Sequence, residues 1–276
     1  MSIFTSKLRP PPFPLADFVG VIRRSALEFI YPPACLLCHV EIPSHSRDER
    51  NVGFPRTAGF DDCSSLCPGC LSKLTAPMGN ACRRCGAPVG PFTVANDHCI
   101  VCQRENYAFD QVIRLGVYLD ELRIACLMAK NPTGGLLSQT LADLLVETKY
   151  GSLAMHGFDA VVPIPEHWVK RFMRPHYAAE TIARRIAARL KVRLSTGILA
   201  KARWTPKQAR SVPVQRRQQQ KNAFCVVGTS VRGKMILLVD DILTTGATAD
   251  AAARELKRAG ASRVVVAVVA VSPPRV

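Results

Sequence analysis

The sequence has no long hydrophobic run. Its longest apolar stretch, Val264 to Val271, is less than half of the about 18 residues that a membrane-spanning helix needs. We expect no secretion signal either, because the PPPFP run and the charges at Asp17, Arg23 and Arg24 interrupt any apolar segment near the N-terminus. We therefore expect a cytoplasmic protein that does not cross a membrane.

Acidic residues are also scarce. The chain has 37 Lys and Arg against 21 Asp and Glu, a formal net charge of +16. Within residues 170–234, Glu180 is the only acidic residue among many Lys and Arg. Such an excess favours an anionic partner, either a phosphorylated substrate or nucleic acid, with a solvated basic face as the alternative. Only Phe172, Tyr177 and Trp204 offer stacking surfaces there, which is thin support for a groove that binds single-stranded DNA.

Cysteine, in contrast, is abundant, and eight of the 11 cysteines form four C-x2-C pairs. This spacing places two thiolates on one tetrahedral ion at about 2.3 Å, and zinc is the metal we expect. Sequential pairing gives two sites, although interleaved pairing is an alternative. Cys63, His39 and His98 lie near enough to replace a ligand, but we expect them to be bystanders. The predicted ligands are Cys35, Cys38, Cys67 and Cys70 for one site and Cys82, Cys85, Cys99 and Cys102 for the other.

Disulfides are the competing explanation for these pairs, and the missing secretion signal argues against them. With four protein ligands on each ion, no position remains for water, so both zinc ions would be structural. A segment with so few large apolar residues also needs the metal in order to fold. We assign residues 32–106 to a double zinc ribbon domain and 1–31 to a tail with an amphipathic helix at Leu15–Tyr31.

After Tyr107 the pattern changes to alternating apolar strands and helices. Continuous apolar strands between helices are typical of a parallel sheet covered on both faces, so we predict one α/β domain over 107–276. Ligands of such sheets bind at the carboxyl ends of the strands. The expected strands are Val112–Tyr118, Phe158–Ile164, Ala223–Val227, Met235–Val239 and Val264–Val271, and the expected helices are Asp120–Ala129, Leu136–Thr148, Arg174–Lys191 and Ala249–Ala259.

The most informative stretch is Met235 to Thr248, MILLVDDILTTGAT. Its apolar strand ends at two adjacent carboxylates, Asp240 and Asp241, and a loop of hydroxyls and one glycine then opens a helix. Unpaired backbone N–H groups and the helix dipole make such a turn an anion cradle. The carboxylates beside it would hold sugar hydroxyls or a divalent metal shared with phosphates, as a phosphorylated ribose bearing pyrophosphate requires. An ordinary strand-end turn with a helix cap is the alternative.

This stretch resembles the binding motif of type I phosphoribosyltransferases. The resemblance implies that Asp240 and Asp241 hold the ribose hydroxyls of phosphoribosyl pyrophosphate (PRPP), with Mg²⁺. It also implies that Thr244, Thr245, Gly246, Ala247 and Thr248 wrap its 5-phosphate.

Two further segments carry implied roles in the same family. The strand end with Pro163 and Pro165, followed by Lys170, Arg171 and Arg174, would receive the pyrophosphate. The polar stretch Thr205 to Lys221 would close over the site and keep water from the reactive carbon. On the sequence alone, the alternative for both segments is an ordinary polar surface loop.

In order along the chain, the cysteine pairs, the PIP strand end and DDILTTGAT resemble the ComF family, competence-associated phosphoribosyltransferase-like proteins. The resemblance spans nearly the whole chain and implies a type I phosphoribosyltransferase-like parallel sheet flanked by helices, behind a small zinc-ribbon domain. It implies phosphoribosyl transfer from PRPP to an unknown acceptor, in DNA uptake (competence) or nucleotide metabolism, with competence-machinery proteins as partners. The alternative is a non-catalytic accessory protein that handles single-stranded DNA with its basic face.

This chain departs from the family in three places. Where the family usually has RGFNQA, residues 174–179 read RPHYAA, and Gln219 replaces the Asn of an R-x2-N element. Thr244 stands where some relatives have an acidic residue that could act as base. His176 is close in sequence and could serve, although a surface histidine is the commoner interpretation. The catalytic residue is therefore left open.

Overall fold

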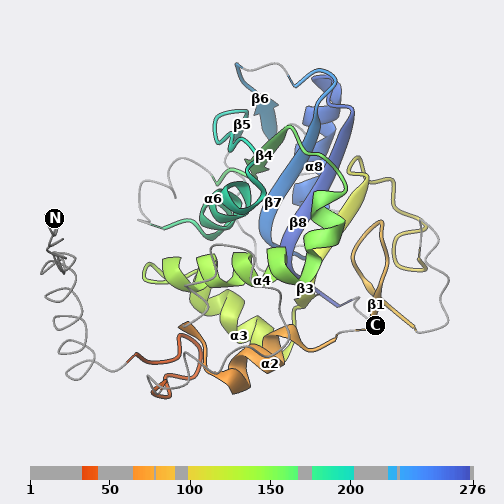
Figure 1. The fold of residues 1–276 in the computed structure, drawn as a ribbon. Helices are drawn as coiled ribbons and strands as arrows, with labels where there is room; N and C mark the ends of the chain where they lie inside the picture. The colour runs from red at the N-terminus through yellow and green to blue at the C-terminus, as the bar shows by residue number, and fades with distance from the viewer. Residues whose placement is uncertain are drawn as a thin grey trace, which may run out of the picture.

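A four-stranded parallel sheet in the order β3-β8-β7-β4 forms the centre of the molecule (Figure 1). Its strands are β3 (Gln111–Val117), β4 (Ala160–Pro163), β7 (Met235–Leu243) and β8 (Arg263–Val271). The computed structural model describes residues 33–42, 65–77, 79–90, 99–166, 176–201, 223–228 and 231–273.

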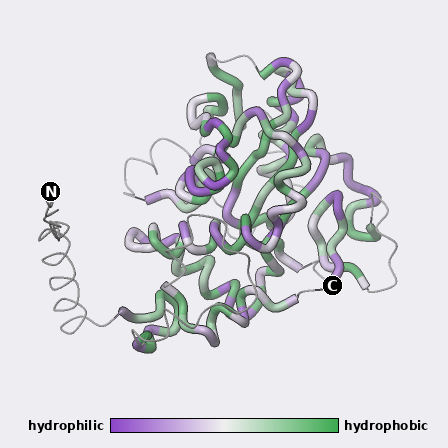
Figure 2. Tube along the Cα trace, viewed as in Figure 1, coloured by the Kyte–Doolittle hydropathy of each residue, from purple (hydrophilic) through white to green (hydrophobic). Residues whose placement is uncertain are grey.

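Helices cover both faces of this sheet. Because side chains alternate along a strand, Leu237 and Val239 of β7 belong to one core cluster and Ile236 and Leu238 to the other. Figure 2 shows hydrophobic residues concentrated along these central strands. The type I phosphoribosyltransferase-like α/β fold that the sequence predicts is confirmed. The first face is covered by α3 (Asp120–Ala129), α4 (Gly135–Ala154) and α6 (Ala178–Leu190), and the second by α8 (Ala247–Arg258).

Most predicted elements match the structure to within a few residues, and the end of α4 is one informative difference. The predicted helix ends at Thr148, and Lys149 indeed leaves helical geometry with φ −122° and ψ 17°. The helix resumes after this kink and continues to Ala154, because Leu153 is buried in the first core cluster.

One predicted strand does not join the central sheet. The apolar run at Ala223–Val227 forms β6 (Phe224–Val226), which pairs antiparallel with β5 (Leu199–Lys201) in a separate two-stranded ribbon. Only Phe224 of β6 is buried, whereas a central parallel strand is buried on both faces. The expectation of a fifth sheet strand is therefore wrong, and β5 itself was not anticipated.

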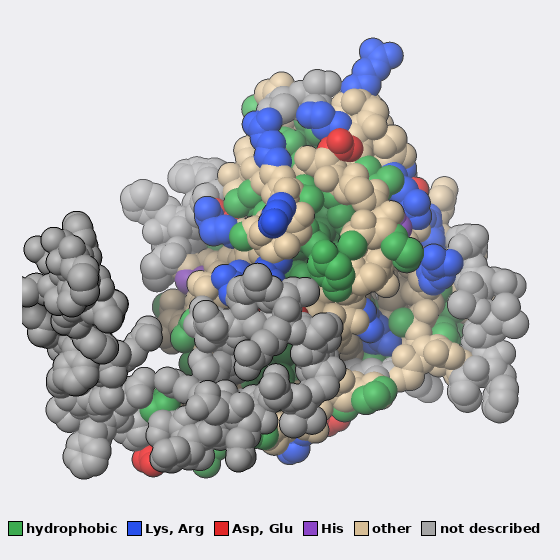
Figure 3. Space-filling model, viewed as in Figure 1, with side chains coloured by type: hydrophobic (Ala, Val, Ile, Leu, Met, Phe, Trp, Pro, Cys, Tyr) green, Lys and Arg blue, Asp and Glu red, His purple; other side chains and the backbone are tan. Residues whose placement is uncertain are grey.

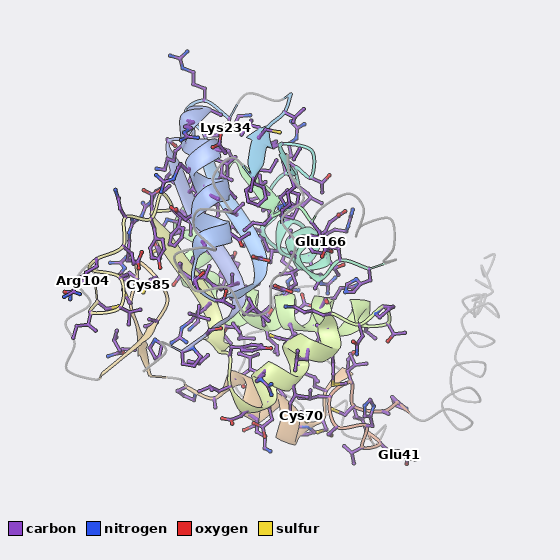
Figure 4. All side chains as sticks on the ribbon, turned by 180° about the vertical axis from the view of Figure 1, so that it is seen from behind. Glu41, Cys70, Cys85, Arg104, Glu166 and Lys234 are labelled. Atoms are coloured by element: carbon purple, nitrogen blue, oxygen red, sulfur yellow. The ribbon has the colours of Figure 1, made fainter. Side chains whose placement is uncertain are left out.

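The cysteine-rich segments pack at two different places on the α/β part. Figure 4 shows Cys70 and Cys85 far apart, with Cys70 in helix α2 (Pro68–Thr75) at the bottom of the view and Cys85 at the left edge. Helix α2 packs under α3, with Leu66 and Leu74 in the first core cluster. The hairpin of β1 (Asn80–Ala81) and β2 (Pro88–Val89) lies next to β3.

Among the described residues, no helix is both long and apolar enough to span a membrane. The predicted N-terminal helix at Leu15–Tyr31 and the polar stretch Thr205–Lys221 lie outside the residues that the structure describes.

Candidate functional site

Asp240 and Asp241 lie inside strand β7 and not after it. The expectation that the strand ends at Val239 is wrong, because β7 stays paired with β8 through Asp240–Val268, Ile242–Ala270 and Leu243–Val271. On its other side β7 loses its neighbour at this point, since β4 ends at Pro163, opposite Val239. The two carboxylates therefore occupy the step where one neighbouring strand stops, at the carboxyl end of the sheet.

Within the described part of the chain, the cation near the two carboxylates is Lys130, at the C-terminal end of α3. Its Nζ lies 3.1 Å from Oδ2 of Asp241. Burial raises the pKa of Asp240 well above its usual range, and repulsion by the Asp241 carboxylate raises it further. Burial disfavours the charged ammonium of Lys130, but the attraction of Asp241 outweighs it and the pKa of Lys130 is raised. The single positive charge of Lys130 therefore has to balance the adjacent carboxyl groups of Asp240 and Asp241.

The predicted cradle forms the turn from β7 into α8. Gly246 adopts φ +75°, a left-handed conformation that favours glycine, and α8 begins at the next residue, two residues earlier than predicted. The Ala247 amide donates to Oγ1 of Thr245 at 3.4 Å. The amides of Thr248 and Ala249 have no acceptor in the described part of the chain, as expected in the first turn of a helix. These amides and the helix dipole can hold an anion.

The predicted pyrophosphate loop is described only at its beginning. Pro163 is buried at the end of β4 and Pro165 is half-buried, while Lys170, Arg171 and Arg174 lie outside the described residues. Tyr177 donates from its hydroxyl to the carbonyl of Ile164 at 2.6 Å.

Tyr177 also lies in the electrostatic field of the paired carboxylates. Burial raises the pKa of Tyr177 well above its usual value, and the charges of Asp240 and Asp241 raise it further. A protonated Tyr177 therefore ties the end of β4 to the start of α6 next to the carboxylates, at a position where the resembled family has Asn.

His176, the candidate base, is engaged at both ring nitrogens. Nε2 lies 3.0 Å from the carbonyl of Ala129 and 3.1 Å from Oγ of Ser138, and Nδ1 lies 3.2 Å from Oγ1 of Thr181. The geometry suits a tautomer whose Nε2–H donates to the carbonyl. In this arrangement His176 holds the end of α3, beside Lys130, and does not point a free nitrogen into the cradle.

Sequence reasoning missed Lys130. Its role depends on how the turn between α3 and α4 meets β7, and no spacing along the chain encodes that contact. The one local signal is a lysine at a helix end followed by the turn-forming residues Asn-Pro-Thr-Gly-Gly. Gly134 in that turn has no room for a side chain, because an added Cβ would lie 2.5 Å from the Met128 carbonyl oxygen.

The eight predicted cysteine ligands gather into two groups of four, in the sequential arrangement. In each group the sulfur atoms all lie within 4.8 Å of one another, and the ten described cysteines are free thiols. The Cys38–Cys67 and Cys85–Cys99 sulfur pairs are 3.6 Å apart, and Cys82–Cys102 is 3.8 Å. A tetrahedral zinc ion with ligands at about 2.3 Å requires roughly 3.8 Å between sulfurs, so both groups fit zinc.

The two groups differ in exposure. Cys38 of the first group is exposed, whereas Cys82, Cys85, Cys99 and Cys102 of the second are all buried. His39 belongs to neither group, and Cys63 and His98 lie outside the described residues.

At Cys35 of the first group, backbone amides favour the thiolate form that a metal requires, whereas burial raises the pKa of Cys70 in the same group. Burial acts to raise the pKa of Cys35, but hydrogen bonds from the backbone of Cys38, Cys67 and Leu37 outweigh it and lower that pKa to about 6.

The basic stretch of residues 170–234 is described only in part, and several of its charges have partners. Arg185 Nε lies 2.8 Å from the buried carboxylate of Asp143, and Arg189 pairs with Glu147. Figure 3 shows the Lys and Arg side chains of one face in separate groups, with hydrophobic and other side chains between them. Binding of single-stranded DNA stays a prediction.

Comparison with known proteins supports the phosphoribosyltransferase-like character of the α/β part. Residues 173–275, which include β7, the cradle and α8, match the family described as "Phosphoribosyl transferase domain". No curated protein matches the chain. Among solved structures, the chain is similar to TT1426 from Thermus thermophilus, at 19% identity over 50% of this chain and 84% of that chain, with a TM-score of 0.31.

Proposed function

We propose that the chain binds PRPP with Mg²⁺ at the carboxyl end of β7 and transfers its phosphoribosyl group to an acceptor. The supporting observation is the placement of Asp240 and Asp241 directly before a cradle of open amides at the start of α8. Carboxylates suit Mg²⁺ and ribose hydroxyls, and the helix N-terminus suits a phosphate. One ligand that carries all three groups explains why acids and an anion cradle lie side by side.

In the proposed reaction a nucleophilic atom of the acceptor bonds to C1 of the ribose while the bond from C1 to the pyrophosphate oxygen breaks. Pyrophosphate leaves with the bonding electron pair, and Mg²⁺, when bound, neutralises its charge. The chain's residues hold the ribose and the 5-phosphate in position and supply charge complementarity. Thr244 is no base and both nitrogens of His176 are engaged. With neither of these two candidates available, we propose that the acceptor's proton passes to the pyrophosphate oxyanion or to solvent.

The two cysteine groups would hold one structural zinc ion each, because the sulfur spacing suits tetrahedral coordination and all four positions would be filled by protein. With these ribbons the chain has the parts of a ComF-type protein, and we propose a role linked to DNA uptake or nucleotide metabolism in the cytoplasm on the strength of that resemblance.

Calorimetric titration with PRPP and Mg²⁺ tests the binding site. The double variant Asp240→Asn, Asp241→Asn should lose the binding heat, because it removes both negative charges and keeps the side-chain shapes. Glu255→Gln is the matched control, since Glu255 lies at the other end of α8 and pairs with exposed Arg258. Absence of heat with the wild-type protein would refute PRPP as the ligand.

Turnover needs a separate experiment. Incubation with PRPP, Mg²⁺ and a panel of nucleobases should release pyrophosphate with the true acceptor class. Binding without release for any acceptor would make the protein a PRPP-binding protein and not a transferase.

A further inference from the structure

Tyr107 contacts the phosphate cradle directly. Its hydroxyl donates to the carbonyl of Thr245 at 3.2 Å. Its ring lies against Gly246, since a Cβ added there would be 3.0 Å from Cε1 of Tyr107. The ring therefore limits how far the cradle backbone can move, and Gly246 leaves the space that this contact needs.

The same ring packs against the second cysteine group. Tyr107 is partly buried and packs against the cluster that contains Cys82, Cys85, Cys99 and Cys102, and it stacks on Phe109 with ring centroids 4.6 Å apart. One side chain thus joins the predicted metal site to the cradle.

Arg84 makes this connection rigid. It lies on the knuckle between Cys82 and Cys85, and its guanidinium donates to the carbonyls of both Tyr107 and Phe109. Its Cζ also lies 5.9 Å from the centre of the Phe109 ring. Because a metal ion on Cys82 and Cys85 would fix the knuckle, it would also fix the backbone on either side of Ala108.

Helix α8 holds the same segment from the other side. The amide of Ala108 donates to Oδ1 of Asp250 at 2.6 Å, and Arg254 bonds both Asp250 and the carbonyl of Asn106. Asp250 lies in the first turn of α8, the turn that supplies the open cradle amides. Residues 106–109 are therefore clamped between the second cysteine group and the helix end that would hold the phosphate.

We propose that Tyr107 is a positioning residue through which the second cysteine group, acting by way of Arg84, sets the geometry of the phosphate cradle. The proposal rests on the proposed function, because it assigns the cradle to the 5-phosphate of PRPP. It gives the second metal site a role in ligand binding in addition to folding.

The variant Tyr107→Phe tests the contact, since it removes the hydroxyl and keeps the ring. With zinc-loaded protein, the dissociation constant for PRPP and Mg²⁺ should rise about fivefold, as expected for one lost hydrogen bond. The zinc content of this variant should remain two ions per chain, the content that we propose for the wild-type protein. Tyr150→Phe is the matched control, because Tyr150 is exposed on α4. Equal PRPP affinity for Tyr107→Phe and wild type would overturn the inference.

Arg84→Met tests the link to the knuckle. In the proposal Arg84 acts on the cradle only through Tyr107. The double variant Arg84→Met, Tyr107→Phe should therefore have the same dissociation constant for PRPP as whichever single variant binds PRPP less tightly. Additive losses would show two independent effects and overturn the proposal.

Hydrogen exchange separates this inference from the proposed function. Amides of residues 244–248 should exchange faster in Tyr107→Phe than in wild type without any ligand. If wild type fails to bind PRPP but exchange still rises, the proposed function fails and the coupling stands. Unchanged exchange at these amides contradicts the coupling, whatever the protein binds.

Discussion

Lys130 and Asp241 form an ion pair of 3.1 Å between the end of α3 and the C-terminal part of β7. Asp240 stands beside the pair with a raised pKa, caused by burial and then by its neighbour's charge. Without a ligand, Lys130 is the counter-charge that the structure supplies to both acids among the described residues. A bound Mg²⁺ would take over that task and change what Lys130 contributes.

Lys130→Met should therefore affect the metal and PRPP in opposite directions. Without the Lys130 cation, the negatively charged PRPP is repelled more strongly by the two carboxylates. The affinity for PRPP should therefore fall about tenfold. Mg²⁺ alone should bind more tightly, because Lys130 no longer neutralises part of the negative charge of the Asp240 and Asp241 carboxylates. Calorimetry with each ligand separately measures both effects.

The control for this variant is Lys73→Met. Lys73 forms a shorter ion pair, 2.6 Å to Glu121, but its side chain is 62% exposed, so its loss should change neither affinity. A parallel loss of PRPP and Mg²⁺ affinity in Lys130→Met would mean that the variant disturbs the fold instead of the charge balance.

The raised pKa of Asp240 predicts a pH-dependent stability. The folded state holds this proton more tightly than the unfolded chain, where the pKa is about 3.9. The stabilisation is complete below the unfolded pKa and is lost as the pH rises through the folded pKa. Asp240→Asn should remove this loss and be more stable than wild type by about 0.5–2 kcal/mol at mildly alkaline pH.

Denaturant unfolding without ligand, at several values between about pH 5 and pH 8, measures the difference in free energy of unfolding. The ligand-free experiment avoids titration of PRPP's own phosphates, which occurs near pH 6. A constant difference between wild type and Asp240→Asn across this range would mean that Asp240 titrates normally.

Elements whose bounds depend on the local pattern of residues were predicted correctly from the sequence. Helix α3 matches its predicted range of Asp120–Ala129, because its apolar residues recur at helical spacing. Strand β8 differs by one residue at its start, because it is a continuous apolar run. Spacing also identified the eight cysteine ligands, although it left sequential and interleaved pairing open, and the structure has the sequential arrangement. These features need few contacts between distant parts of the chain.

Features that depend on distant partners could not be read from local pattern. Strand β7 runs past its apolar part because backbone pairing with β8 does not require apolar side chains at Asp240 and Asp241. The contacts of Lys130 with Asp241 and of Tyr107 with Thr245 join segments far apart in the chain. Each became visible only once the fold had brought both partners together.

The two cysteine groups should bind two zinc ions per chain and release them at different rates. Exposed Cys38 gives a chelator direct access to the first group, whereas every cysteine of the second is buried. Release should therefore be biphasic, with the first zinc lost faster. Elemental analysis gives the total, and a colorimetric chelator assay follows the two phases.

Variants assign the two phases. Cys38→Ser should abolish the fast phase and leave the slow one, because only the first group contains Cys38. Fewer than about one zinc per chain would contradict metal binding by these groups. A single phase would contradict their difference in access.

Gly134 tests whether the turn after Lys130 is as tightly packed as the structure shows. In Gly134→Ala the new Cβ would lie 2.5 Å from the Met128 carbonyl oxygen and 2.6 Å from that of Ala129, backbone atoms that cannot move independently. The variant should lose about 1–3 kcal/mol of unfolding free energy, measured by denaturant titration. PRPP affinity should fall as well, because relief of the clash displaces the end of α3 and with it Lys130.

Gly151→Ala is the matched control on the same helix. No atom lies within 4 Å of a Cβ added there, so the alanine should stabilise α4 by about 0.5–1 kcal/mol through its higher helix propensity. Opposite signs for the two Gly→Ala changes would show that contact with the end of α3, and not glycine's helix propensity, decides the effect at residue 134. If both variants were stabilised equally, the turn at Gly134 would have space for a methyl group. The close packing that the structure shows after Lys130 would then be contradicted.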